Sequence, residues 1–131
     1  MHIVARVLSL LIALTFLITA VQWIADPAAA AQGLGMELLT GLGASTQIGD
    51  IGALFISLPI MIGLAQRQGQ AHWLLPASLL LLSAAGMRTL GWATGNAGFG
   101  AQFIVPEVVM AAILFSCERH TRIRSAREAA G

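Results

Sequence analysis

Three charged side chains within apolar sequence are the residues best suited to chemistry. Asp50, Arg88 and Glu107 each lie in a stretch of otherwise hydrophobic residues. A charge at membrane depth costs about 2.5–3.5 kcal/mol on insertion scales, so these residues are expected to pair. An arginine fork can bind one carboxylate through two bonds and reach a second. The residue types therefore predict an Asp50–Arg88–Glu107 cluster, serving either as a structural ion cluster or as a ligand, ion or proton site.

The sequence lacks the common catalytic signatures. It contains no GxSxG, no HExxH, no phosphate-binding loop and no Rossmann fingerprint. The single cysteine, Cys117, excludes an internal disulfide, and His2, His72 and His120 are far apart in the sequence. Nucleic-acid binding has no support beyond a short basic segment at the C-terminal end. We therefore expect a non-enzymatic protein with no cofactor, no metal and no nucleic-acid partner.

The elements that must position these charges are membrane-spanning helices. The chain is 57% hydrophobic and only 10% charged, whereas a soluble domain usually carries about 25% charged residues. A spanning helix needs about 20 mostly apolar residues. Four runs approach this length, and glycine-rich or polar turns separate them: 3–24, 44–65, 73–94 and 101–117. The sequence predicts an all-α, integral membrane four-helix bundle over residues 1–118, followed by a basic tail over 119–131.

The placement of arginine predicts the orientation. The N-terminal end, the second loop and the tail carry arginine, whereas the first and third loops carry neither lysine nor arginine. The positive-inside rule therefore places both termini and the tail in the cytoplasm. One alternative is that the charged start and the first apolar run form a secretory signal cleaved near "DPAAAAQ", which would leave three spans and move the N-terminus outside. The first apolar run is longer than the 7–15 residues usual for such a signal.

This orientation brings the three charges to one depth. Asp50 and Glu107 follow the outer ends of their runs by about six residues, and Arg88 precedes the outer end of its run by the same number. At 1.5 Å per residue, each lies roughly 9 Å inside the outer boundary. Thr19 and Gln22 of the first run lie at a similar or shallower level. We expect them to complete the hydrogen bonds of a cluster near the outer leaflet.

Two further patterns concern packing and depth. The second run carries a stripe of small residues spaced four apart: Ser45, Gly49, Ala53 and Ser57. Such a stripe predicts close approach of another helix. All the tryptophans fall near predicted membrane boundaries: Trp23, Trp73 and Trp92. We expect these side chains to anchor the helices at the membrane interface.

Four short stretches carry a family resemblance. They are "ADPAAAAQGLGM", "TQIGDIGALFISL", "GMRTLG" and "VPEVVMAAIL". In this order they resemble the small bacterial four-helix membrane proteins of domain-of-unknown-function family 4345, some of which are labelled phage infection protein. The resemblance covers roughly residues 5–118 and implies a multi-pass fold in the bacterial inner (plasma) membrane, but no activity. In many relatives the second helix opens with an Arg and a Tyr-Gly-Gly-like stretch, which this chain replaces with "STQIGDIGA".

Two functional hypotheses follow. The first is a binding or accessory component that contacts the lipid bilayer and a second copy of itself or another membrane protein. In its phage-related version, the outer loops 26–43 and 95–100 affect phage adsorption. The alternative is a small oligomeric transporter or proton-coupled carrier that uses Asp50, Arg88 and Glu107. A membrane redox or lipid-modifying enzyme would need a cofactor for which the sequence offers no ligands.

Overall fold

The computed structural model describes the backbone of residues 3–130 and the side chains of residues 3–127, and every regular element in this part is helical. The α-helices are α1 (Ile3–Ala25), α2 (Pro27–Gly33), α3 (Gly41–Thr46), α4 (Gly52–Ala65), α5 (Leu74–Ala93) and α6 (Ala101–Ala130). A π-helical turn, η1 (Gln47–Ile51), joins α3 to α4, and a 3-10 turn, η2 (Ala71–Trp73), precedes α5.

Four helical segments are long and apolar enough to cross a membrane: Ile3–Ala25, Gly41–Ala65, Ala71–Ala93 and Ala101–Arg127. Large apolar side chains such as Ile18, Leu79 and Val105 are exposed on their outer faces. Helices that are apolar on their outer as well as their inner faces are typical of membrane spans. The predicted all-α class with four spanning helices is confirmed, and it indicates a multi-pass membrane protein.

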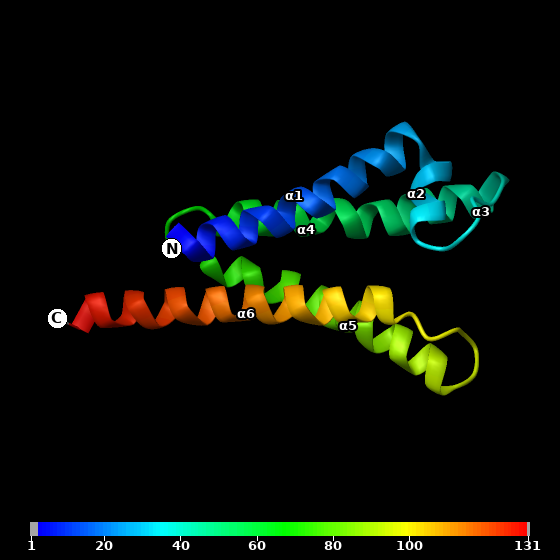
Figure 1. Ribbon diagram of the computed structural model, residues 1–131. Coiled ribbons are helices and arrows are strands. Elements are labelled where there is room, and N and C mark those ends of the chain that lie inside the picture. Colours follow the sequence, from blue (N-terminus) through cyan, green and yellow to red (C-terminus); the bar gives the residue numbers. More distant parts are fainter. Residues whose placement is uncertain (1–2, 131) are drawn as a thin grey trace.

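The long helices form two antiparallel pairs. Figure 1 shows α1 beside α4 and α5 beside α6. The start of α1 and the end of α6 lie at the same end of the molecule, where the two pairs meet. Toward the other end the pairs separate, and α2, α3 and the 94–100 loop lie there (Figure 1). We call this the open end of the bundle.

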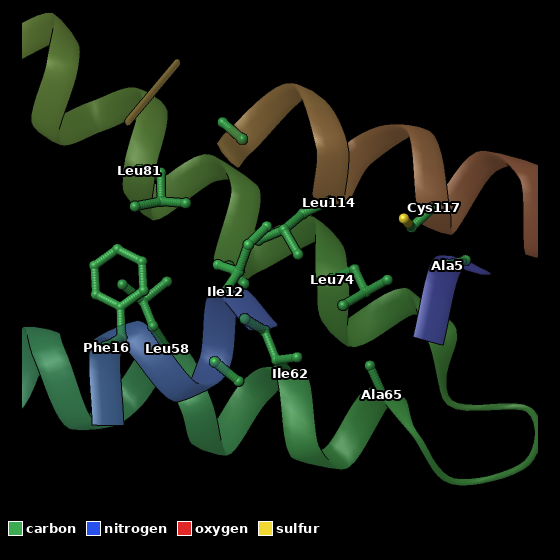
Figure 2. Packing of buried hydrophobic residues seen from close by; sticks show 13 residues of the cluster. Ala5, Ile12, Phe16, Leu58, Ile62, Ala65, Leu74, Leu81, Leu114 and Cys117 are labelled. Carbon is green, nitrogen blue, oxygen red and sulfur yellow. The ribbon is translucent and has the colours of Figure 1, made fainter. Parts of the chain in front are cut away.

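The core joins the two pairs away from the open end. Figure 2 shows side chains from all four long helices meeting there. Leu58 and Ile62 of α4, Leu74 of α5 and Leu114 of α6 are fully buried. Phe16 of α1 closes the core on the side toward the open end and stacks in a tilted arrangement on Phe55, with ring centroids 5.6 Å apart.

Small residues set the contact between α5 and α6. Ala77 and Ala111 are fully buried, and the Ser78 hydroxyl donates a hydrogen bond to the Ala111 carbonyl at 2.8 Å. Small side chains let two helix backbones approach closely, and a serine hydroxyl can then bond across the interface. The α5–α6 pair is therefore held in one register, which fixes the side chains further along both helices.

The segment after α1 folds back over the open end. Asp26 caps α2 by accepting a hydrogen bond from the Ala29 N–H at 3.0 Å, and Pro27 occupies the first turn, where its missing N–H costs nothing. The Gln47 side chain then holds the following loop, because it accepts from the Leu39 N–H at 2.7 Å and donates to the Glu37 carbonyl at 3.0 Å. These bonds bring Met36 inward.

The tryptophans differ from one another in their surroundings. Trp23 is only 1% exposed and packs against Ala30 and Ala31 of α2, so its predicted role as an interface anchor is wrong. The cause is the return of the chain through α2, which covers the indole. Trp73 is half-buried against the core, and Trp92 is exposed beside Phe99, with ring centroids 4.9 Å apart.

The stripe of small residues on the second span is mostly exposed, and only its last member, Ser57, is half-buried. Ser45, Gly49 and Ala53 are exposed, and no atom outside its own helix lies within 4 Å of a Cβ built at Gly49. The π turn over Gln47–Ile51 explains the difference, because its wider turn shifts the register that a four-residue spacing assumes. Gly52 approaches α1 instead, with its Cβ position 3.8 Å from the Trp23 Cβ.

The fourth span is longer than the predicted 101–117 run. α6 continues to Ala130, so most of the predicted basic tail over 119–131 is helix. No glycine or proline interrupts the sequence between Pro106 and the end of this helix. An i,i+4 pair between Glu118 and Arg122, 3.7 Å apart, supports the same turn.

Candidate functional site

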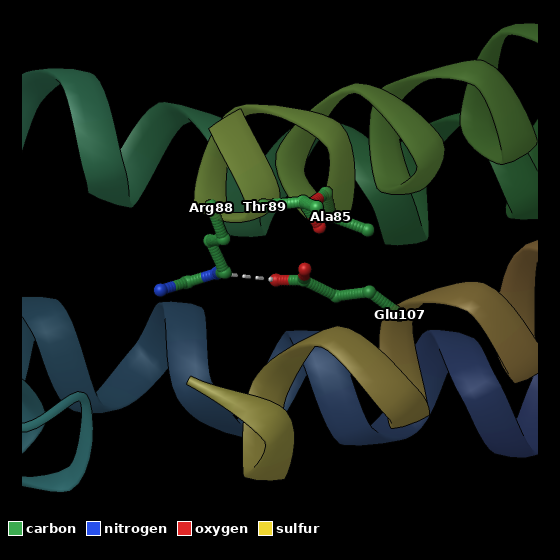
Figure 3. A network of polar contacts seen from close by, with 4 residues as sticks. All are labelled: Ala85, Arg88, Thr89 and Glu107. Carbon is green, nitrogen blue, oxygen red and sulfur yellow. Dashed lines mark hydrogen bonds and ion pairs between the residues drawn. The ribbon is translucent and has the colours of Figure 1, made fainter. Parts of the chain in front are cut away.

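Arg88 and Glu107 face each other across the α5–α6 pair. The Arg88 Nε donates to the Glu107 Oε1 at 3.1 Å, and the two side chains are 37% and 14% exposed. Figure 3 shows the carboxylate pointing from α6 toward α5, with the rest of the guanidinium extending away from it. The 94–100 loop is short, so α5 and α6 run side by side from this loop and residues at matching distances from it become neighbours.

Phe103 covers one face of the Arg88 guanidinium. The Arg88 Cζ lies 4.8 Å from the centroid of the Phe103 ring, within the range of a cation–π contact. Phe103 lies one helical turn before Glu107, so α6 contributes both the ring and the carboxylate. Sequence reasoning missed Phe103, although its i,i+4 spacing from Glu107 could have indicated it.

The pair leaves polar atoms without partners. The Glu107 Oε2 is buried and makes no hydrogen bond within the described residues. Arg88 contacts the carboxylate through its Nε alone, so its terminal nitrogens make no hydrogen bond in this part of the chain. A buried unsatisfied polar atom is rare in proteins, and it is a feature of ligand sites as well as of strain.

Asp50 lies near the pair but does not bond to it. Asp50 belongs to the π turn, and within the described residues its carboxylate makes no hydrogen bond or ion pair. It lines the same cavity as Arg88 and Glu107. The expected three-residue ion cluster is therefore wrong in its bonding, because the separation of the helix pairs holds α4 away from α5 at this end.

The polar residues expected from α1 do not join the cluster. The Thr19 hydroxyl donates to the Thr15 carbonyl of its own helix at 3.2 Å, which satisfies it locally. Gln22 is exposed, and neither residue lines the cavity. Thr89, next to Arg88, likewise bonds the Ala85 carbonyl at 2.8 Å (Figure 3). These three residues therefore give the Arg88–Glu107 pair no hydrogen bond.

The cavity lies between the two helix pairs, next to the open end of the bundle. Its volume is about 240 Å³, and all four spans contribute to its wall. Most of the lining is apolar and comes from Phe16, Leu34, Met36, Ile51, Leu54, Phe55, Leu58, Leu80, Leu81 and Ala84. The charged groups of the lining are Asp50, Arg88 and Glu107. An apolar cavity with a few convergent polar groups is the usual form of a small-molecule site.

The described residues do not form a metal site. No group of three or more histidine, cysteine, aspartate or glutamate side chains among them is close enough to hold an ion. Cys117 is free and buried in the core, at the opposite end of the bundle from the Arg88–Glu107 pair. What the arrangement can do is bind: it can pack an apolar group and offer charged partners to a polar one.

Comparison with known proteins adds no identity. No family model matches the sequence, no curated protein matches it, and no solved structure matches the fold. The resemblance to family 4345 stays a prediction from the four stretches that carry it.

Proposed function

We propose that this chain is a non-enzymatic binding component of the bacterial inner membrane that holds a small apolar or amphipathic molecule between its two helix pairs. The observation that carries the proposal is the cavity of about 240 Å³, with an apolar wall and the three charges Asp50, Arg88 and Glu107 in its lining. The apolar wall takes the body of the ligand, and the charged groups take its polar end.

A purely structural role for the charges does not explain the unpartnered oxygen of Glu107. A carboxylate retained only to hold two helices in register would be expected to satisfy both of its oxygens. Glu107 instead leaves a buried Oε2 without a partner in the described part of the chain, whereas Asp50 is exposed. Both groups line the cavity, where a bound polar group would meet them.

The proposal includes an orientation. Arginines of the 66–70 turn and of the end of α6 gather where the two helix pairs meet, so this end is assigned to the cytoplasm and the open end to the outer face. In a Cys117→Ser background, Asn96→Cys should react with a membrane-impermeant maleimide in intact cells. Gln68→Cys should react only after permeabilisation, and the opposite pattern would refute the orientation. We also expect the first span to stay uncleaved, because α1 supplies Ala5, Ile12 and Phe16 to the core. Mass spectrometry of the purified protein should therefore give the mass of the uncleaved chain.

Filling the cavity should abolish binding. Ala84 lines the cavity one turn before Arg88, so Ala84→Phe places a ring where the ligand would lie. We expect photolabelling by a neutral alkyl alcohol with a terminal diazirine to reach Phe55, Leu58 or Leu81 in the unaltered protein and to fall at least about tenfold in Ala84→Phe. Peptide mass spectrometry of the labelled sites measures this.

The matched control for this test is Ser83→Phe. Ser83 is adjacent in sequence but exposed on the outer face of α5, so the same ring added there should leave cavity labelling unchanged. Equal labelling of both variants, or labels confined to exposed side chains such as Leu79 and Leu82, would reject the cavity as a binding site.

The second candidate is a small carrier, as an oligomer. The position of Glu107 favours it, because ionisable residues within spanning helices commonly mark transport pathways, and its buried Oε2 has no hydrogen-bond partner among the described residues. Proton release from detergent-solubilised protein on addition of ligand would support the carrier. Ligand binding without any proton exchange across pH 5–9 would contradict the proton-coupled carrier and support the binding component.

A further inference from the structure

The charges of the cavity do not balance. Arg88 and Glu107 neutralise each other in their salt bridge, and Phe103 covers one face of the guanidinium. Asp50 remains: it is exposed and makes no hydrogen bond or ion pair with the described residues, so its carboxylate is the charge of the lining without a protein partner. With both carboxylates ionised, the lining carries a net charge of minus one. The site therefore attracts a cation.

The hydrogen-bonding atoms agree with this charge. The Glu107 Oε2 is a buried acceptor without a donor, and the Asp50 carboxylate is acceptor-only when ionised. The cavity thus presents at least two unused acceptor groups, and the unused donors of Arg88, its terminal nitrogens, extend away from the Glu107 carboxylate (Figure 3). A head group that is both positive and rich in N–H donors satisfies both, whereas an anion would meet two carboxylates of its own sign.

The size of the cavity limits the rest of the ligand. Its volume of about 240 Å³ lies below the roughly 300–1,000 Å³ typical of pockets for drug-sized molecules. The wall is formed mainly by leucine, isoleucine and phenylalanine side chains. A single slender alkyl chain suits this space, and a two-chain phospholipid does not fit within it.

We propose that the ligand is a single-chain amphiphile with a protonated amine as its head group. The amine binds between Asp50 and the free Oε2 of Glu107, and the alkyl chain lies along Phe55, Leu58 and Leu81. This inference rests on the proposed function and specifies the ligand class of the same cavity.

Trp23 offers a reporter next to the chain. It is buried and packs in one cluster with Leu34, Met36, Ile51 and Phe55, all four of which also line the cavity. A bromine atom on the alkyl chain should therefore quench its fluorescence at short range. Trp73→Phe and Trp92→Phe together leave Trp23 as the sole fluorophore, because the chain has three tryptophans.

The experiment compares head groups on one chain. The full-length protein in nanodiscs is titrated with ω-bromoundecylammonium, ω-bromoundecanol and ω-bromoundecanoate at neutral pH, and quenching is plotted against the bilayer-bound concentration of each probe. We expect saturable quenching, with the ammonium half-saturating at least about tenfold below the alcohol and the carboxylate weakest. Asp50→Asn should remove most of this preference, and Asp50→Glu should retain it.

Asp26→Asn is the matched control. Asp26 lies at the same end of the bundle but does not line this cavity, and asparagine caps a helix as well as aspartate does. This variant should keep the preference for ammonium. The head-group order in the Trp73→Phe/Trp92→Phe protein with unaltered charges is itself decisive, so the test does not depend on any charge variant folding.

The outcomes separate the two proposals. Equal quenching by ammonium and alcohol, or tightest binding of the carboxylate, would overturn the amine assignment and leave a binding cavity. Quenching that stays linear for all three probes and is unchanged by Ala84→Phe would overturn the cavity as a binding site, and the amine assignment with it.

Discussion

Replacing Arg88 by methionine is expected to destabilise the bundle by about 3 kcal/mol, because it leaves the Glu107 carboxylate without its only ion partner among the described residues. Glu107→Gln should cost less, since a neutral amide still accepts a hydrogen bond from the guanidinium. The double variant Arg88→Met/Glu107→Gln should lose much less than the sum of the two, with a coupling above about 1 kcal/mol. Reversible unfolding in mixed micelles, or the thermal midpoint in nanodiscs, measures the cycle.

The control for this cycle is an arginine outside the pair. Arg119 is exposed on α6 and lies away from the cavity, so Arg119→Met should change the unfolding free energy by no more than about 0.5 kcal/mol. Additive losses in the double variant would mean that Arg88 and Glu107 do not interact in the membrane. A stable Arg88→Met would show that the carboxylate has another partner there.

Ala111→Leu is expected to have a comparably large effect for a different reason. Ala111 is fully buried where α6 crosses Ser78, and its carbonyl accepts the Ser78 hydroxyl at 2.8 Å. A leucine there must push the two backbones apart, which overpacks the interface and breaks this bond. The expected loss is about 3 kcal/mol, at the upper end of the usual cost of overpacking.

The neighbouring residue provides a direct comparison. Ala112 is exposed on the same helix, so Ala112→Leu adds the same atoms toward lipid and should be nearly neutral. Both variants can be followed by thermal denaturation in identical nanodiscs. If Ala111→Leu were as stable as Ala112→Leu, the close α5–α6 contact would be absent in the folded protein.

The four spans could be predicted because apolar length alone determines them. The meeting of Arg88 with Glu107 followed from the sequence for a similar reason. A short loop joins their helices, and the two residues lie at about equal distances from it, so an antiparallel pair brings them opposite each other. Counting residues from the loop is sufficient to predict such a contact when the loop is short and both helices are regular.

The predictions that were wrong concern residues whose positions depend on an irregular helical turn or on tertiary packing. The π turn shifts the register of the second span, so the small-residue spacing no longer marks a packed face. Asp50 does not bond Arg88 because the two helix pairs separate at this end. Burial of Trp23 depends on α2 folding back, which a hydropathy pattern does not encode. The cavity depends on the separation of the two helix pairs, a property of tertiary packing that single-helix patterns do not contain.

The continuation of α6 beyond the core turns that helix into a lever. From Cys117 to Ala130 the helix extends about 20 Å, and this part carries the arginines of the C-terminal segment. If α6 tilts by roughly 10° about its contact with α5, the far end of the lever moves by about 3–4 Å. A rearrangement at the open end that tilts α6 would thus also displace a probe attached at the opposite end of the molecule.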